Sequence, residues 1–520
     1  MLSLVKVKNM AAKYELNDAS VIVVIGSGAG GGTLANELCQ KGDKVVCLEA
    51  GGHLKQEDFV NDELTMWGKL TWQDPRTGQP VWIVKAVGGS TVHWAGLSIR
   101  MKDYELKTRT TYGAVPGANL LDWPISLEDL EPYYGKAESK MGVTGTNGLP
   151  PQPDTNAFKV VNYCAKRAGY SFQMGPSAIN SVARDGRPAC QMIGFCTSGC
   201  KIGAKWSTLY TEIPKALETG NFELRPNCMA LQIQHNAGGM VTGVLYADKD
   251  GKQQVQKARI VCVAGNSIES PRLLLNSASN MFKDGMANSS GQVGRNYMRH
   301  ATQHMYATFD RPVHAHRGIH APGILRSEAR HDPSRGFAGG YHLEIFDVGF
   351  PLTALSVVPG GWGRKVSSLV EQYDHMVAVW TCGEDLAQVD ARITLDGSIK
   401  DQYGLPIPNI AAVKDHPNDV EMLKHARNTL QTIFQAGNAK DIVWRPPFPN
   451  SHNMGSLRMS AKPADGVCNG WGQTHDIKNL FISDGSQFTS SGACNPTLTI
   501  VALAIRQADY IHNQMGTGAI

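Results

Sequence analysis

The chain has 520 residues, of which 42% are hydrophobic, 18% are charged and 55 are glycine, so it is long enough for a globular protein of more than one domain. Its formal net charge of +4 comes from 50 basic and 46 acidic side chains without long like-charge runs, which excludes the basic surface typical of a nucleic-acid-binding protein. Its longest apolar runs fall well short of the ~18 residues that cross a bilayer, so we expect no transmembrane segment of its own.

The first twenty residues contain lysines but no twin arginine and no apolar core of about 7–15 residues, which a secretory signal needs. The sequence therefore predicts no export on a signal of its own. The eleven cysteines are irregularly spaced, which favours free thiols or metal ligands over a disulfide framework.

Residues 21–52 predict one strand, a glycine turn, a helix and a second strand at 44–48. Gly26, Gly28 and Gly31 fit the G-x-G-x-x-G pattern, in which glycines make the turn, admit a pyrophosphate and allow close helix packing. Glu49 ends the second strand, where a carboxylate can hold ribose hydroxyls. This order indicates a dinucleotide-binding unit; the alternative is a glycine-rich turn without a ligand.

The chain then changes character several times. Residues 101–189 contain proline and glycine clusters and are predicted to be an insertion. Residues 222–262 alternate apolar and polar positions, which predicts an antiparallel sheet element that returns to a central strand, followed by a turn and a helix. Residues 301–449 contain histidines, aromatic residues, a strand-like stretch at 375–382 and a predicted helix at 418–436, and they are expected to face the substrate.

Three separated blocks carry a family resemblance: VGGSTVHWAGLS at 87–98, NSHNMGSLRMS at 450–460, and the stretch from NLFISDG to ADYI at 479–511. Together with the glycine turn they resemble the glucose-methanol-choline (GMC) oxidoreductases, flavoenzymes that bind FAD and oxidise alcohols. The resemblance implies a mixed α/β fold with a Rossmann-like FAD-binding domain and a substrate domain built on an antiparallel sheet. It places the FAD-binding domain at 15–100, 190–300 and 450–520, a cap at 101–189 and the substrate domain at 301–449.

The resemblance also implies two catalytic residues, His452 and Asn495. A neutral imidazole can accept the hydroxyl proton of an alcohol, and an asparagine amide can donate to the developing alkoxide. Without the family blocks, His452 would be interpreted as a core histidine and Asn495 as a helix N-cap before Pro496.

Further residues are assigned to FAD by the same resemblance. Gly89 and His93 lie in the block that passes the flavin, and His93 precedes a tryptophan as in members that attach FAD covalently; packing beside the flavin is the alternative. Asp484 and Gly485 are expected near the FAD phosphates and ribityl chain. Arg299 stands where the family has an acidic residue, so no role is predicted for the neighbouring His300.

Cys190, Cys196 and Cys200 form a C-x5-C-x3-C pattern followed by KIGA. It resembles the cysteine cluster that holds a 3Fe-4S iron-sulfur centre in the large FAD subunits of bacterial gluconate, glucose and fructose dehydrogenases, although Lys201 replaces a proline. Thiolates suit iron-sulfur ligation. Zinc would require a fourth ligand, and packed thiols or a structural relict are the alternatives.

The resulting hypothesis is an FAD-dependent dehydrogenase that oxidises a hydroxyl of a sugar, sugar acid or glycoside and passes electrons through the cluster to a cytochrome c or a quinone-linked acceptor. The alternatives are a hydrogen-peroxide-forming oxidase of the pyranose-oxidase type and a non-catalytic electron-relay subunit. A small partner subunit and periplasmic location by co-export are expected, with a cytoplasmic enzyme as the alternative. Tyr341, His342 and Trp380 are candidates for a sugar site, with ordinary sheet packing as the alternative.

Overall fold

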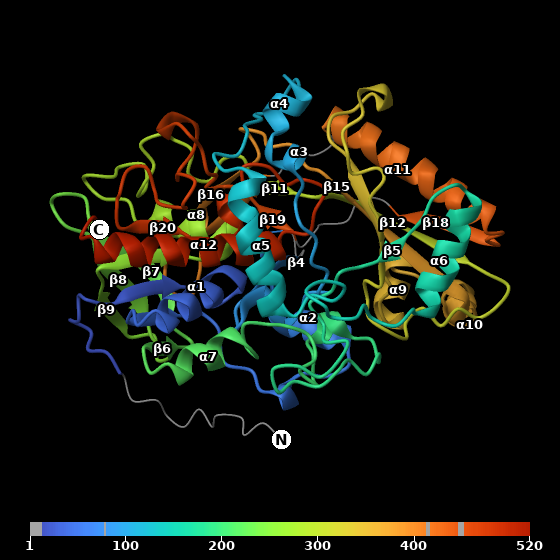
Figure 1. Ribbon diagram of the computed structural model, residues 1–520, viewed down its shortest axis with the longest axis horizontal. Helices are drawn as coiled ribbons and strands as arrows, with labels where there is room; N and C mark the ends of the chain where they lie inside the picture. The colour runs from blue at the N-terminus through green and yellow to red at the C-terminus, as the bar shows by residue number, and fades with distance from the viewer. Residues whose placement is uncertain (1–12, 77–79, 412–415, 446–451) are drawn as a thin grey trace.

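The computed structural model describes residues 13–76, 80–411, 416–445 and 452–520. Two sheets dominate this part of the chain, one in each half of the molecule (Figure 1). The first is a parallel sheet with the strand order β20-β10-β1-β2-β6. Its strands are β1 (Ile22–Ile25), β2 (Val45–Leu48), β6 (Phe222–Arg225), β10 (Ile260–Val263) and β20 (Leu480–Ile482).

The central strands of this sheet are short apolar runs because both of their faces are covered. On one face the helices α1 (Ala29–Gln40) and α12 (Thr497–Gly516) pack together, with α5 (Leu127–Met141) on α12 and α7 (Glu212–Glu218) on α1. The other face carries α8 (Asn266–Asn276) and an antiparallel sheet of β7 (Met229–His235), β8 (Val241–Ala247) and β9 (Gln253–Lys257).

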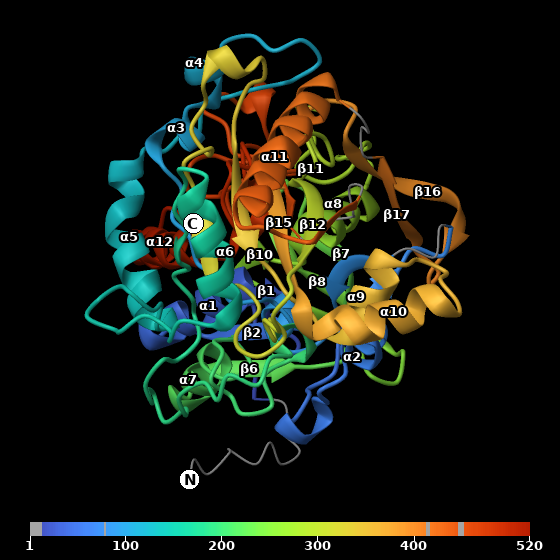
Figure 2. The ribbon, with the colours of Figure 1, turned by 90° about the vertical axis from the view of Figure 1, so that its right-hand side faces the viewer.

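The second sheet is antiparallel, with the order β18-β12-β15-β14-β13-β5 among the described strands. Its members are β5 (Gln173–Met174), β12 (Ala301–Thr308), β13 (Gly323–Leu325), β14 (Tyr341–Ile345), β15 (Met376–Gly383) and β18 (Asp441–Arg445). Helices α6 (Asn156–Arg167) and α11 (Pro417–Ala436) cover one face (Figure 2). The opposite face turns toward the parallel sheet and is available to line a site.

Smaller elements connect the two halves. The two-stranded ribbons are β3 (Thr71–Gln73) with β4 (Pro80–Val84), β11 (Met298–Arg299) with β19 (Asn453–Met454), and β16 (Arg392–Lys400) with β17 (Pro406–Ala411). The remaining helices are α2 (Glu63–Leu70), α3 (Asp103–Leu106), α4 (Thr108–Tyr112), α9 (Phe350–Val357) and α10 (Arg364–Gln372). None of the helices in the described residues is both long and apolar enough to span a bilayer.

The predicted fold class is confirmed: the chain combines a parallel α/β core with an antiparallel sheet domain. One local expectation is wrong, since β6 is not part of an antiparallel element but pairs in parallel with β2 at the edge of the main sheet. The predicted insertion at 101–189 contributes α5 to one half and α6 to the other. The domain boundaries stay predictions, and the boundary at 449/450 and residues 1–12 lie outside the described residues.

Candidate functional site

One cavity runs from the glycine turn after β1 to the open face of the antiparallel sheet. At the turn, Gly26 has φ +100°, and a Cβ on it would lie 2.4 Å from the Ala264 carbonyl oxygen. A Cβ on Gly31 would lie 2.0 Å from the Gly26 oxygen, and one on Gly89 would lie 2.8 Å from the Cα of Gly28. The glycines are therefore required by backbone contacts, and they leave a cradle of the kind that receives a pyrophosphate at a helix N-terminus.

Acidic groups stand at two strand ends beside this cradle, as the sequence predicts. Glu49 accepts hydrogen bonds from the Ser27 amide at 3.0 Å and hydroxyl at 2.7 Å, and from the Gly51 amide at 2.9 Å. Asp484 accepts from the Asn266 amide at 2.7 Å and so fixes the start of α8. Burial raises the pKa of both carboxyls, against the opposing effect of these hydrogen bonds. Both residues, and Gly485, line the cavity.

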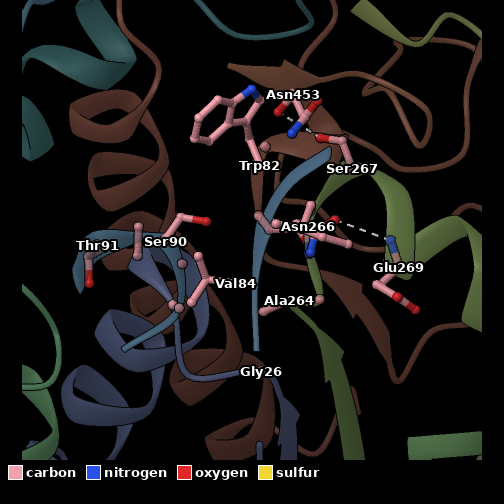
Figure 3. A pocket seen from close by; sticks show the side chains of 18 of the residues that line it. Gly26, Trp82, Val84, Ser90, Thr91, Ala264, Asn266, Ser267, Glu269 and Asn453 are labelled. Carbon is pink, nitrogen blue, oxygen red and sulfur yellow. Dashed lines mark hydrogen bonds between the residues drawn. The ribbon is translucent and has the colours of Figure 1, made fainter. Parts of the chain in front are cut away.

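Figure 3 shows the part of the cavity between β4 and the start of α8. The Ser267 hydroxyl donates to the Asn453 carbonyl at 2.9 Å, which ties α8 to the strand that begins next to His452. Trp82 and Val84 project from the opposite side. Three segments that are far apart in the sequence thus form the walls of this part of the cavity.

The far end of the cavity is lined by one face of the antiparallel sheet. His304 on β12 pairs with Trp380 on β15, and Trp380 pairs with Glu344 on β14. Side chains alternate across a strand, so these three share a face, and all three line the cavity. Tyr341 lies on the opposite face, where its hydroxyl bonds His425 at 2.9 Å; the expectation that it lines the site is wrong. His342 lies behind Glu344, with Nε2 3.5 Å from Oε2.

The two predicted catalytic residues meet at this end. The Asn495 side-chain nitrogen lies 3.5 Å from His452 Nε2 and 3.4 Å from Glu344 Oε2. A carboxylate oxygen can only accept, so the amide must present its N–H groups to both neighbours. His452 Nε2 therefore accepts this hydrogen bond, so it carries a lone pair and no proton, and the residue lines the cavity.

His300 supplies an independent argument for the same protonation state. The antiparallel pair Arg299↔Asn453 on β11 and β19 brings the next residues, His300 and His452, face to face, with 2.9 Å between their Nδ1 atoms. His300 Nε2 lies 2.8 Å from the Gly492 carbonyl, which can only accept, so Nε2 carries the proton. Burial lowers the pKa of His300 to about 4, so its Nδ1 is a bare acceptor at neutral pH.

In the contact between the two Nδ1 atoms, His452 must therefore be the donor and His300 the acceptor. A neutral imidazole carries one ring proton, so His452 Nε2 is unprotonated. Burial, and to a smaller extent the neighbouring His300 and His342, holds the pKa of His452 well below its ordinary value. The Cys382 sulfur lies 3.2 Å from His300 Nδ1 and 3.9 Å from His452 Nδ1, and burial raises the pKa of this thiol. His452 is thus a neutral imidazole in the tautomer that a general base requires.

His93 is buried in the cavity wall and stacks on Trp82, with ring centroids 6.3 Å apart and an interplanar angle of 9°. Burial lowers the pKa of His93 to about 3. Trp67 packs edge-on against Trp82 at 4.5 Å and donates from its indole to the Thr197 carbonyl at 3.2 Å. Covalent attachment of FAD through His93 stays a prediction.

Thr197 belongs to the loop of Cys190, Cys196 and Cys200, whose thiols are free and partly accessible. Each sulfur accepts a backbone hydrogen bond: Cys190 from Met192 at 3.4 Å, Cys200 from Lys205 at 3.4 Å, and Cys196 from His320. Burial raises the pKa of Cys196 to about 12, against a lowering effect of Lys205 and with smaller raising effects of the Cys190 and Cys200 thiols. The three thiols therefore share one local environment.

Lys205 is a buried cation that the sequence reasoning missed. Its ammonium group donates to the carbonyls of Val92, Trp94 and Cys196. It thereby joins the loop around His93 to the cysteine loop. Burial lowers its pKa to about 8. A lysine in the sequence carries no sign of such a position, because its partners are backbone oxygens.

The fold and the site have the features of a flavin-dependent oxidoreductase: a glycine cradle beside an acidic strand end, and a neutral imidazole at the other end of the same cavity. Family models described as GMC oxidoreductase match residues 75–302 and 387–504. The chain belongs to the GMC oxidoreductase family, whose members oxidise alcohol-type substrates with FAD.

Relatives cover nearly the whole chain. The 2-methyl-1,2-propanediol dehydrogenase of Mycolicibacterium austroafricanum is 33% identical over 95% of this chain and 95% of its own. The fructose dehydrogenase large subunit of Gluconobacter japonicus is 30% identical over 96% of this chain and 98% of its own. A formate oxidase structure shares the fold, with a TM-score of 0.69 and 14% identity over 95% of this chain and 98% of that chain.

Proposed function

We propose that this protein oxidises a hydroxyl group of a sugar, sugar acid or glycoside as an FAD-dependent dehydrogenase. The observation that carries the proposal is the fixed tautomer of His452, whose unprotonated Nε2 faces the cavity beside the Asn495 amide. Similarity to a fructose dehydrogenase large subunit supports the substrate class.

The chemistry requires a proton and a hydride to leave the same alcohol. The substrate hydroxyl donates to His452 Nε2 and accepts from the Asn495 amide, so its proton passes to the imidazole while the amide stabilises the charge on oxygen. FAD, when bound, supplies the acceptor for the hydride on the carbinol carbon. Asn495 and the neighbouring Glu344 are buried, and a low-polarity surrounding strengthens hydrogen bonds.

Anaerobic mixing of the holoenzyme with a panel of sugars, sugar acids and polyols tests the proposal. We expect at least one of them to bleach the flavin absorbance rapidly. His452→Ala should retain FAD and bleach about 10²- to 10⁴-fold more slowly. If no alcohol in the panel bleaches the flavin of the wild-type holoenzyme, the proposal is wrong and a non-catalytic relay role gains support.

We further propose that Cys190, Cys196 and Cys200 hold a 3Fe-4S cluster. The donor set fits, because three free thiols share one loop and each accepts a backbone N–H, the kind of second contact that tunes iron-sulfur centres. The Trp67–Trp82 contact, which joins this loop to the cavity wall, supports an electron path between the two sites. A cluster supplies one-electron transfer, which suits a cytochrome c or quinone-linked acceptor and a partner subunit.

Iron analysis and electron paramagnetic resonance on the purified protein test the cluster. We expect about three irons per flavin and a signal that is lost in Cys196→Ser but kept in Cys164→Ala, a buried cysteine on α6 that serves as control. Iron-free protein that reduces its acceptor at full rate would exclude a required cluster. Rapid oxygen consumption without an added dye would favour the oxidase alternative.

A further inference from the structure

Three polar atoms at the substrate end of the cavity are buried without a hydrogen-bond partner among the described residues. They are Oδ1 of Asn495, Oε1 of Glu344 and the indole Nε1 of Trp380. Glu344 and Trp380 have no part in the proposed proton transfer. Both residues line the cavity, and Glu344 is only 1% exposed. Burying an unpaired carboxylate oxygen or indole N–H costs free energy, so a ligand that satisfies both offsets a penalty already present in the fold.

These two groups are neighbours. Glu344 on β14 and Trp380 on β15 are directly paired in the antiparallel ladder, with side chains on the cavity face. The two side chains therefore lie side by side on that face, as those of cross-strand pairs do. A group that both accepts from Trp380 and donates to Glu344 would complete the site.

The same location is next to the reacting hydroxyl. Glu344 Oε2 lies 3.4 Å from the Asn495 nitrogen that also faces His452. The two hydroxyls of a 1,2-diol lie within hydrogen-bond distance of each other. This spacing matches the distance between the Asn495 amide and the Glu344 carboxyl group. A hydroxyl several carbons away would not reach both positions from one short substrate.

We propose that Glu344 and Trp380 bind a second hydroxyl on the carbon adjacent to the one that is oxidised, so that the enzyme selects 1,2-diols over monohydric alcohols. The inference rests on the proposed oxidation of an alcohol at His452 and narrows its substrate class. The second hydroxyl donates its proton to Glu344 Oε1 and accepts from the Trp380 N–H, and it takes no part in the redox step.

A hydroxyl fits this pair of groups better than an ammonium group does. An ammonium can donate to Glu344 but has no lone pair for the Trp380 N–H, whereas a hydroxyl can donate to Glu344 and accept from Trp380.

Flavin reduction by propane-1,2-diol and by 1-propanol tests the selection. A hydrogen bond to a charged group corresponds to about a ten- to hundredfold change in a binding constant, so the diol should have a kcat/KM at least tenfold higher. In Glu344→Gln and in Trp380→Phe the ratio should fall toward one, mainly through KM. The control is Glu384→Gln, a buried carboxylate outside the cavity that bonds Tyr112, and it should leave the ratio unchanged.

A second measurement separates this inference from the proposed function. The compound 2,3-dimethylbutane-2,3-diol has no carbinol hydrogen and cannot be oxidised, and 2,3-dimethylbutan-2-ol is its monohydric match. Binding of each to the holoenzyme is measured by perturbation of the flavin spectrum. Tighter binding of the diol, lost in Glu344→Gln, supports the inference; equal binding of the pair by the wild type overturns it. Absence of bleaching by every oxidisable alcohol would refute the proposed function instead.

Discussion

Replacement of His300 by leucine removes the nitrogen that accepts the His452 Nδ1 proton at 2.9 Å. With that acceptor gone, only the Asn495 amide still favours a proton on His452 Nδ1, so the tautomer with the proton on Nε2, which blocks catalysis, becomes more populated. We expect FAD binding to persist, because His300 directly precedes β12 and is not part of the glycine cradle. The defect should therefore appear in flavin reduction and not in cofactor content.

The expected size follows from the hydrogen bond that is lost. An unpaired buried donor costs about 1–3 kcal/mol, which disfavours the competent tautomer by about 5- to 150-fold. Full removal of a general base costs about 10²- to 10⁴-fold. The rate of flavin reduction in His300→Leu should thus fall between those of the wild type and His452→Ala. His300→Gln, whose amide can both accept and donate, should recover much of the loss.

The assay is anaerobic stopped-flow reduction by a saturating alcohol across pH. His452 works only when neutral, so activity is lost as the pH falls through its pKa. Because His300 contributes to lowering that pKa, its removal should move the acid limb to higher pH as well as reduce the rate. His475→Asn, at a half-buried loop position that bonds Ser460, is the control. A wild-type rate and an unmoved pH profile in His300→Leu would refute the tautomer argument.

Three other changes give further tests. Gly31→Ala would place a methyl group 2.0 Å from the Gly26 oxygen, so we expect protein with little or no FAD, as measured by the ratio of flavin to protein absorbance. Gly68→Ala, at an exposed position of α2, should keep full FAD and gain up to about 1 kcal/mol of stability. Burial raises the pKa of Glu384 to about 8, so the folded state holds a proton that the unfolded state releases above pH ~4.5, and stability falls by about 1.4 kcal/mol per pH unit up to pH 8. Glu384→Gln should flatten this part of the pH–stability curve in denaturant titrations. Trp67→Leu should slow reoxidation of reduced flavin by a one-electron acceptor while the rate of reduction by substrate is unchanged; equal reoxidation rates would count against the electron path.

The glycine cradle could be predicted from sequence because its determinants are local. Gly26, Gly28 and Gly31 lie within six positions, and the strands and helix around them follow from nearby apolar periodicity. His452 and Asn495 were found through blocks that resemble the family. The structure places them within 3.5 Å of each other and so makes the pairing a physical contact.

The rest of the site depends on contacts between distant segments. His300 lies 152 positions from His452, and Glu344 lies 151 positions from Asn495, so neither could be assigned without the β11–β19 and β14–β15 pairings. The side of the sheet on which Tyr341 lies could not be predicted from the sequence either. Its strand was recognisable as part of the substrate region, but which alternate residues face the cavity depends on the neighbouring helices α6 and α11.

The most direct test of the account is the reductive half-reaction of wild type and His452→Ala, each with bound FAD, mixed anaerobically with the same 1,2-diol. The account predicts that the wild-type flavin bleaches rapidly and that the variant, with the same flavin content, bleaches about 10²- to 10⁴-fold more slowly. Bleaching of the variant at a rate close to that of the wild type would show that His452 is not the base and would contradict the central claim.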